Sequence, residues 1–261
     1  MKALAARRHH RFAPVVLIML ALLVTGAVYA ALAPSSAQAE DAVTTADDIE
    51  HGAALFQANC ATCHGVDAVG KADAPSLIGV GAAAVHFQVS TGRMPMQSNA
   101  PQAPVKPVQF DEKQTMQLAA YIASLAPGPE IPSAEAVDPT LGDPARGAAL
   151  FSTNCAMCHN AVGAGGALSE GKYAPALWNT TPTQIYEAMI TGPQSMPVFN
   201  ESNITPEEKR DVIAYVVAQR DGTPGGENLG SLGPVSEGLW AWILGIGVLI
   251  GAAVWIGAKS S

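Results

Sequence analysis

Two long apolar segments stand near the two ends of the chain. The first runs from Pro14 to about Ala33, comes after four basic residues and precedes a stretch of small residues. This order is typical of a secretory signal, and Ala37-Gln38-Ala39 offers a cleavage site. An apolar run of about 20 residues is also long enough to span a bilayer. We therefore expect residues 1–39 to be either a signal peptide or an N-terminal membrane anchor, and both would export the residues beyond Ala39.

The second apolar segment covers residues 239–258 and contains no charged side chain. At ~1.5 Å per helical residue it matches the ~30 Å thickness of the hydrocarbon core. Trp240, Trp242 and Trp255 lie near its ends, as tryptophans do at membrane interfaces. We expect a transmembrane helix here. The positive-inside rule puts both termini in the cytoplasm and the residues between the apolar segments on the other side of the membrane.

Between these segments the apolar positions indicate short helices joined by long loops, and no strand pattern is convincing. Capping residues precede several helices, and a glycine comes after each middle helix. The start signals are Thr45 with Asp48, Asp143 with Pro144, and Thr205 with Pro206 and Glu208; the two glycines are Gly92 and Gly192. The predicted helices are 49–59, about 82–91, 112–125, a helix beginning at 144, about 183–191 and 206–219.

A repeat organises this middle part of the chain. His51–Gly65 matches Arg146–Asn160 at ten of fifteen positions, with a constant offset of 95. Two later blocks recur in the same order: Thr91–Pro95 with Thr191–Pro197, and Ala120–Ile122 with Ala214–Val216. We therefore expect two homologous all-α domains and not a solenoid.

The repeat sets the expected domain boundaries. Domain 1 covers residues 43–126 and domain 2 covers 142–221. The Pro-rich stretch 127–141 between them is expected to be an extended linker. A second linker, 222–238, leads to the membrane segment.

Charge and cysteine usage narrow the function. The net charge of −8 argues against nucleic-acid binding, which needs a basic face. All four cysteines, Cys60, Cys63, Cys155 and Cys158, lie in two Cys-x-x-Cys-His motifs, so none is left for a structural disulfide.

The Cys-x-x-Cys-His motif predicts covalent attachment of a c-type haem. Two thiols three positions apart can form thioether bonds to one haem, and the adjacent His64 or His159 becomes the proximal iron ligand. A thioredoxin-like redox pair is disfavoured because no βαβ pattern surrounds it, and a Cys₄ zinc site because about 90 residues separate the two pairs. The sequence thus predicts two covalently bound haem c groups.

The second axial ligand is expected from methionine, as in electron-transfer cytochromes. Met94 and Met196 each precede a proline in matching Gly/Pro loops after a middle helix. Met96 is the rival of Met94, although domain 2 has Val198 at its place. His86, in the middle helix of domain 1, is a further alternative ligand, or else a surface or second-layer residue.

Pro75 and Pro175 come after the two haem-binding histidines. Each is either a turn proline or the residue whose carbonyl accepts a hydrogen bond from the proximal imidazole. With both axial positions filled, the irons have no open site for a substrate. This favours outer-sphere electron transfer over bond-making catalysis, and no catalytic residues are expected.

Cys60–His64 with Met94, and Cys155–His159 with Met196, each resemble a class I cytochrome c domain. Two such domains ahead of a C-terminal membrane helix are similar to the dihaem cytochrome cc subunit of the actinobacterial cytochrome bcc complex, a menaquinol–cytochrome c reductase. Thr191–Phe199 matches that family closely.

This resemblance implies partners: a cytochrome b subunit, a Rieske iron–sulfur subunit and a cytochrome c oxidase in a supercomplex. It implies that single electrons pass from the Rieske cluster through two haems to the oxidase, so that the chain is an electron-transfer subunit with no substrate site of its own. The alternative is a membrane-anchored dihaem carrier serving another dehydrogenase or oxidase. A dihaem peroxidase is disfavoured because it needs an open iron.

Overall fold

The computed structural model describes residues 15, 18–25, 45–72, 74–98, 100–221 and 234–258. The chain divides into two compact units, residues 1–42 and 43–261. In the first unit, residues 18–25 are helical, and Thr25 Oγ1 donates to the Ala21 carbonyl at 2.7 Å. Most of the expected signal or anchor, including its cleavage site, lies outside the described residues.

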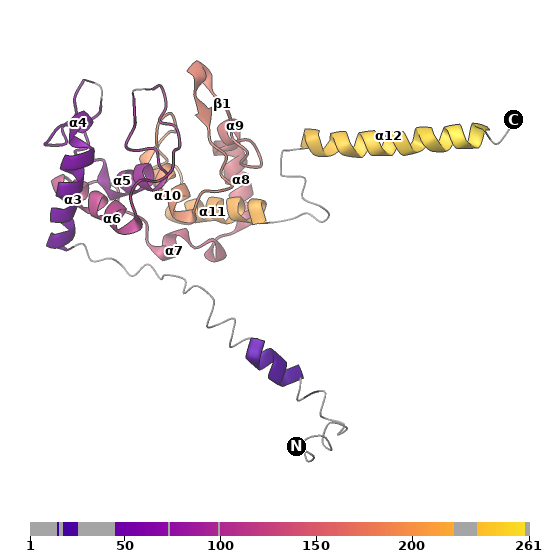
Figure 1. Cartoon of the computed structure of the whole chain (residues 1–261), viewed down its shortest axis with the longest axis horizontal. Coiled ribbons are helices and arrows are strands. Elements are labelled where there is room, and N and C mark those ends of the chain that lie inside the picture. The colour runs from indigo at the N-terminus through magenta and orange to yellow at the C-terminus, as the bar shows by residue number, and fades with distance from the viewer. Residues whose placement is uncertain are drawn as a thin grey trace, which may run out of the picture. The chain divides into compact units, whose positions relative to one another are not determined.

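Domain 1 is built from helices that surround one small core (Figure 1). They are α3 (Ala46–Asn59), α4 (Ala61–His64), α5 (Gly81–Ser90) and α6 (Glu112–Leu125). The predicted capping box is present, since Thr45 and Asp48 exchange hydrogen bonds at the start of α3. Buried Phe56, Val89, Leu118 and Ile122 form the centre of the core.

Domain 2 repeats this plan with an added hairpin. It contains α8 (Pro144–Asn154), α9 (Ala156–His159), β1 (Gly166–Ala167), η2 (Ser169–Gly171), β2 (Tyr173–Ala174), α10 (Pro182–Thr191) and α11 (Pro206–Asp221). As predicted, Asp143 caps α8 and Pro144 is its first residue. Gly192 ends α10 in the left-handed conformation, at φ 61°. Phe151, Ile185, Met189 and Ile213 are buried at the centre of its core.

The two domains use the same helix crossing. Gly52 of α3 lies against the Gln117 carbonyl of α6, and Gly147 of α8 lies against the Asp211 carbonyl of α11. A Cβ at either glycine would come within 2.0 Å or 1.9 Å of that oxygen, so only glycine allows the approach. This equivalence supports the sequence repeat as a structural duplication.

Two expectations differ from the structure. The linker is not extended throughout, because α7 (Ala134–Val137) and η1 (Pro139–Leu141) form within it and Val137 is buried in the core of domain 2. A two-stranded antiparallel ladder joins β1 to β2, although no strand pattern is visible in the sequence. Strands of two residues are too short to show the alternation by which a strand is recognised.

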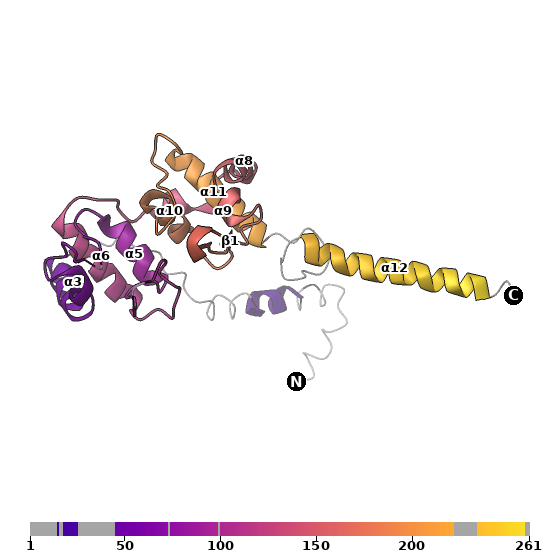
Figure 2. The same ribbon diagram turned by 90° about the horizontal axis from the view of Figure 1, so that it is seen from above.

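Helix α5 of domain 1 and helix α10 of domain 2 are in contact (Figure 2). Separately, α12 (Pro234–Ala258) forms the C-terminal helix. Its residues 238–258 have a mean hydropathy of 2.2 and are long and apolar enough to cross a membrane. The predicted helical class and C-terminal apolar helix are therefore confirmed.

Candidate haem sites

Each Cys-x-x-Cys-His motif occupies a break between two helices. Cys60 ends α3, donating its amide to the Phe56 carbonyl at 2.8 Å, and then begins α4. Cys155 does the same between α8 and α9, with the same 2.8 Å bond to the Phe151 carbonyl. A single helical turn then brings each histidine back over the first cysteine, because the amides of His64 and His159 bond to the Cys60 and Cys155 carbonyls at 3.0 and 2.9 Å.

The four cysteine thiols are free. Burial raises the pKa of Cys60 to about 11, with a smaller contribution from the neighbouring Cys63. Burial and the neighbouring Cys158 raise the pKa of Cys155 to about 11 as well. The first thiol of each pair is therefore protonated at neutral pH.

The two cysteine pairs are not brought together. Within the described part of the chain, no group of three or more His, Cys, Asp or Glu side chains could hold a metal ion. This contradicts the alternative of a Cys₄ zinc site.

Both candidate proximal histidines are held in the same way. His64 Nδ1 lies 2.9 Å from the Pro75 carbonyl oxygen, and His159 Nδ1 lies 3.0 Å from the Pro175 carbonyl oxygen. The structure thus decides between the two roles considered for these prolines, because both carbonyls accept a hydrogen bond. A proton on Nδ1 leaves Nε2 unprotonated and free to bind a metal. Burial lowers the pKa of His159, which also favours the neutral ligand form, although its bond to Pro175 opposes this.

The two candidate distal methionines lie on loops that fold back onto the preceding helix. The Met94 amide donates to the Gln88 carbonyl of α5 at 2.9 Å, and the Phe199 amide donates to the Met189 carbonyl of α10 at 2.7 Å. Met94 packs against the core of domain 1, and Met196 packs against the core of domain 2.

The two alternatives to Met94 have other surroundings. Met96 is half-buried but does not belong to the core cluster that contains Met94. His86 Nδ1 lies 2.7 Å from Glu187 Oε1 of domain 2, so its ring faces the other domain.

The donor set in each domain fits a c-type haem. Each domain supplies two free thiols, one imidazole whose Nδ1 is already bonded, and one thioether on a loop at the core. These are the groups needed for two thioether bonds and for His/Met ligation of one iron.

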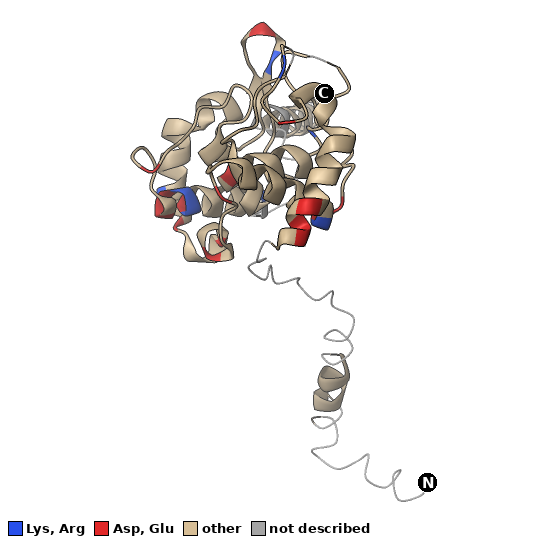
Figure 3. Cartoon of the chain, turned by 90° about the vertical axis from the view of Figure 1, so that its left-hand side faces the viewer, with Lys and Arg blue, Asp and Glu red and all other residues tan. Residues whose placement is uncertain are grey.

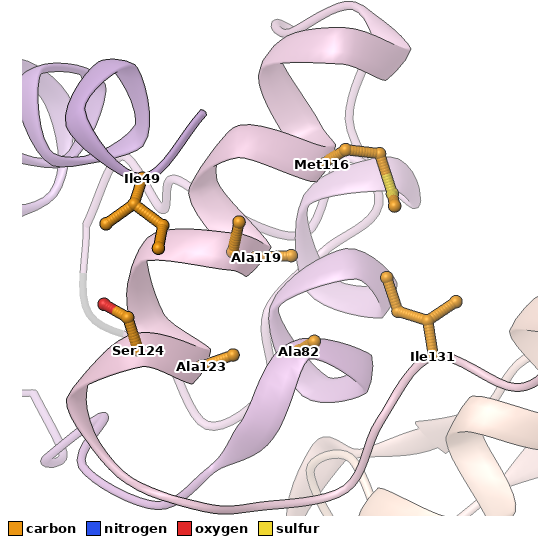
Figure 4. A pocket seen from close by; sticks show the side chains of 8 residues that line it. Ile49, Ala82, Met116, Ala119, Ala123, Ser124 and Ile131 are labelled. Carbon is orange, nitrogen blue, oxygen red and sulfur yellow. The ribbon is translucent and has the colours of Figure 1, made fainter. Parts of the chain in front are cut away.

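Domain 1 also has an apolar pocket that is separate from these groups. Ile49, Met116, Ala123 and Ile131 are among its lining residues, which come from α3, α5, α6 and the linker (Figure 4). No cysteine, histidine or methionine of the candidate haem sites lines it. It is therefore not the site at which a haem would be attached.

The structure shows polar contacts between the two domains that the sequence does not predict. Gln102, on the loop after Met94, bonds to both backbone groups of Tyr173 in β2. The next amide, of Ala103, donates to Gln194 Oε1, two residues before Met196. Isolated polar residues in loops carry no periodic signal, so neither contact could have been found from the pattern of the chain.

Acidic and basic positions are interspersed along the described helices and loops, as the red and blue segments of the ribbon in Figure 3 show.

Comparisons with known proteins match both domains. Residues 49–126 match the family "Cytochrome c", and residues 142–216 match "Cytochrome C oxidase, cbb3-type, subunit III". Two cytochrome c domains mean two covalently bound haem c groups, as the motifs predict.

Longer relatives match most of the chain. A "Cytochrome bc1 complex cytochrome c subunit" of Corynebacterium efficiens is 47% identical over 81% of this chain and 77% of its own length. The proteins of the same name from Corynebacterium diphtheriae and Mycobacterium bovis are 46% and 44% identical, covering 81% and 97% of this chain and 81% and 93% of their own lengths. With this identity along nearly the whole sequence, the chain belongs to the family of cytochrome c subunits of cytochrome bc1 complexes.

Proposed function

We propose that the chain relays single electrons from a Rieske iron–sulfur protein through two haems to a terminal cytochrome c oxidase. The observation that carries this is that two domains in contact through α5 and α10 each hold one histidine bonded to a proline carbonyl and one methionine packed against the core. One such domain would suffice for a mobile carrier. Two in contact provide an entry and an exit for electrons within one anchored chain.

The proposed ligands divide the work in each domain. Cys60 and Cys63, and Cys155 and Cys158, hold the two haems covalently. His64 and His159 are the proximal ligands, and the Pro75 and Pro175 carbonyls fix the orientation of their rings.

Met94 and Met196 are the proposed distal ligands. Met/His ligation would raise the reduction potential of a bound haem iron. It would also leave no coordination site for a substrate or peroxide. A bound haem would supply a reversible one-electron change at its iron. The histidine and the methionine of the chain would keep substrates from binding to that iron.

The C-terminal helix α12 determines where the two haem domains lie relative to the membrane in this proposal. We propose that α12 anchors the chain with both haem domains on the extracytoplasmic side and the termini in the cytoplasm, beside a cytochrome b subunit. Anchoring raises the effective concentration of electron donor and acceptor without a tight interface. Reporter fusions to each terminus test this orientation, and a C-terminal reporter active only outside the cytoplasm would contradict it.

The proposed partners are tested by isolating the complex. A tagged full-length chain is solubilised in a mild detergent, purified, and its companions are identified by mass spectrometry. We expect a cytochrome b, a Rieske protein and oxidase subunits, and reduction of both haems when a quinol is added. An unrelated tagged membrane protein from the same cells serves as control.

The alternative of an anchored dihaem carrier for another enzyme predicts a different result. In that case the chain would purify without cytochrome b and Rieske protein, and added quinol would leave its haems oxidised. That outcome would replace the reductase proposal.

A further inference from the structure

A buried carboxyl group of domain 2 faces a histidine of domain 1. Glu187, on α10, has a fully buried side chain, and its Oε1 lies 2.7 Å from Nδ1 of His86, on α5. Its other oxygen, Oε2, is also buried and has no hydrogen-bond partner among the described residues. The His86 side chain is 17% exposed, so the imidazole has a route to water that the carboxyl lacks.

The fold does not require an acid at this position. Thr91 Oγ1 donates to the Phe87 carbonyl and Thr191 Oγ1 donates to the Glu187 carbonyl, each at 2.6 Å, so Phe87 and Glu187 occupy equivalent places in the repeat. Domain 1 fills its place with a buried phenyl ring. Burying a carboxylate costs free energy unless it is paired. The glutamate at this place in domain 2 therefore needs an explanation other than the fold shared with domain 1.

Three charged side chains of α11, which packs against α10, have partners other than Glu187. On α11, Lys209 donates to the Ile204 carbonyl and lies over the Tyr186 ring, Asp211 pairs with Arg146, and Arg220 donates to the Thr180 carbonyl. The other ionisable residues of these neighbouring elements whose side chains the structure describes are Glu135 on α7, Glu207, Glu208, Arg210 and Tyr215 on α11, and Glu112, Lys113 and Tyr121 on α6, which packs against α5.

Burial raises the pKa of Glu187, while the hydrogen bond and the charge of His86 lower it by less. Among the ionisable groups around α10, His86 is the one whose charge bears on this carboxyl. The carboxyl and the imidazole therefore act on each other directly where the two domains meet.

The pair sits on the two helices that lead to the proposed distal ligands. Met94 is bonded through its amide to Gln88, two residues after His86. Phe199, three residues after Met196, is bonded through its amide to Met189, two residues after Glu187. A change of charge at either iron would act on the pair most strongly where the protein excludes water, because electrostatic interactions are strong at low dielectric constant.

We propose that His86 and Glu187 form a redox-linked proton site between the two haem domains, which binds one proton when a haem is reduced. This rests on the proposed function, because it needs a haem that gains and loses an electron.

The step balances in electrons and protons. In the oxidised protein, the imidazole is neutral and its Nδ1–H group donates a hydrogen bond to the Glu187 carboxylate. The pair then carries one negative charge. When one electron arrives from the donor, one proton from water adds to His86 Nε2 and gives an imidazolium–carboxylate pair of zero net charge. When the electron leaves, the proton returns to water.

The test is the pH dependence of the haem midpoint potentials in the purified full-length haem protein. Spectroelectrochemical titrations cover about pH 5–9, the range in which histidines and buried carboxyls titrate in proteins. In the wild type, we expect the potential of at least one haem to fall with rising pH by up to ~59 mV for each tenfold change in proton activity. In Glu187→Gln and in His86→Gln this slope should fall by at least half.

Glu135→Gln is the matched control, since it makes the same chemical change at an exposed carboxylate of α7. It should keep the wild-type slope. His86→Gln retains a side-chain donor toward Glu187 at a partly exposed position, so it serves if Glu187→Gln does not fold. Proton uptake by the wild type on reduction, followed with a pH dye in weak buffer, gives an independent measure.

A wild-type potential that does not change with pH, or a slope that both variants retain, would overturn the proposal. A purely structural role of the pair would shift both potentials without changing their slopes, and that too would contradict it. Because these titrations use the isolated chain, their outcome is distinct from that of the search for partners.

Discussion

Gln102 of domain 1 holds Tyr173 of domain 2 by both of its backbone groups. Gln102 Nε2 donates to the Tyr173 carbonyl at 2.8 Å, and Gln102 Oε1 accepts from the Tyr173 amide at 2.9 Å. Two residues further along, the Pro175 carbonyl bonds to His159. The loop after Met94, the proposed distal ligand of one site, thus holds the strand that leads to Pro175, whose carbonyl bonds to His159, the proposed proximal ligand of the other site.

Replacing Gln102 with alanine should loosen this strand. Two hydrogen bonds are lost, each with a net contribution of about 1 kcal/mol. We expect hydrogen exchange of the Tyr173 amide to accelerate by roughly tenfold or more, because 1.4 kcal/mol corresponds to a factor of ten. Gln219→Ala, at an exposed position of α11, is the control. Unchanged exchange at Tyr173 would show that the contact does not persist in solution.

The choice between Met94 and Met96 as iron ligand can be tested by paired substitutions. We expect Met94→His to lower the potential of one haem by a few tenths of a volt, within the ~0.8 V range that axial ligands span. Met96→Leu should leave both haem potentials unchanged. It should also leave in place the two absorption bands that arise from the bonds between iron and methionine sulfur. The physical reason is that Met94 packs into the core of domain 1, whereas Met96 does not belong to that cluster.

The opposite result would reassign the ligand. If Met96→Leu removes an absorption band of the iron–methionine bond and Met94→His does not shift a potential, the thioether ligand comes from Met96. Met196→His provides a reference in domain 2, where Val198 replaces the rival methionine and a downward shift is expected.

A methyl group at Gly147 should destabilise domain 2. Its Cβ would lie 1.9 Å from the Asp211 carbonyl oxygen and 3.0 Å from the Tyr215 Cβ, so α8 and α11 must separate. Overpacking of this kind costs about 1–3 kcal/mol. We expect Gly147→Ala to lower the free energy of unfolding by that amount in denaturant titrations. Ala149→Ser, on the exposed side of α8, should change it by less than about 0.5 kcal/mol.

Local signals explain what the sequence predicts well here. The capping pairs at Thr45 and Asp143 and the glycine at 192 act within one helical turn, and all three do what their types favour. The repeated motif fixes the two-domain plan because each copy carries its own core. Contacts such as Glu187 with His86 join residues 101 positions apart and depend on how two finished domains pack, which no local pattern encodes.

The carboxyl group of Asp211 makes the stability of domain 2 depend on pH. Burial raises its pKa. Hydrogen bonds from Arg146 and from the Asp143 amide, together with the charges of Arg146 and Arg210, lower it by a larger amount, so the pKa lies below its usual value. A carboxyl whose pKa is lowered in the folded protein stabilises it above the unfolded pKa of about 3.9, and this contribution is lost as the pH falls through the folded value.

We therefore expect Asp211→Asn to lower the free energy of unfolding by about 1.5–3 kcal/mol near pH 7, the contribution of hydrogen bonds to a charged group. The wild-type contribution fades as the pH falls from the unfolded pKa of about 3.9 toward the lower folded value, so the difference between the two proteins should shrink there. Denaturant titrations at a series of pH values measure it, with Glu201→Gln in an exposed loop as control. A difference that stays constant from neutral to acid pH would mean that packing of Asp211 stabilises the domain and that its charge does not.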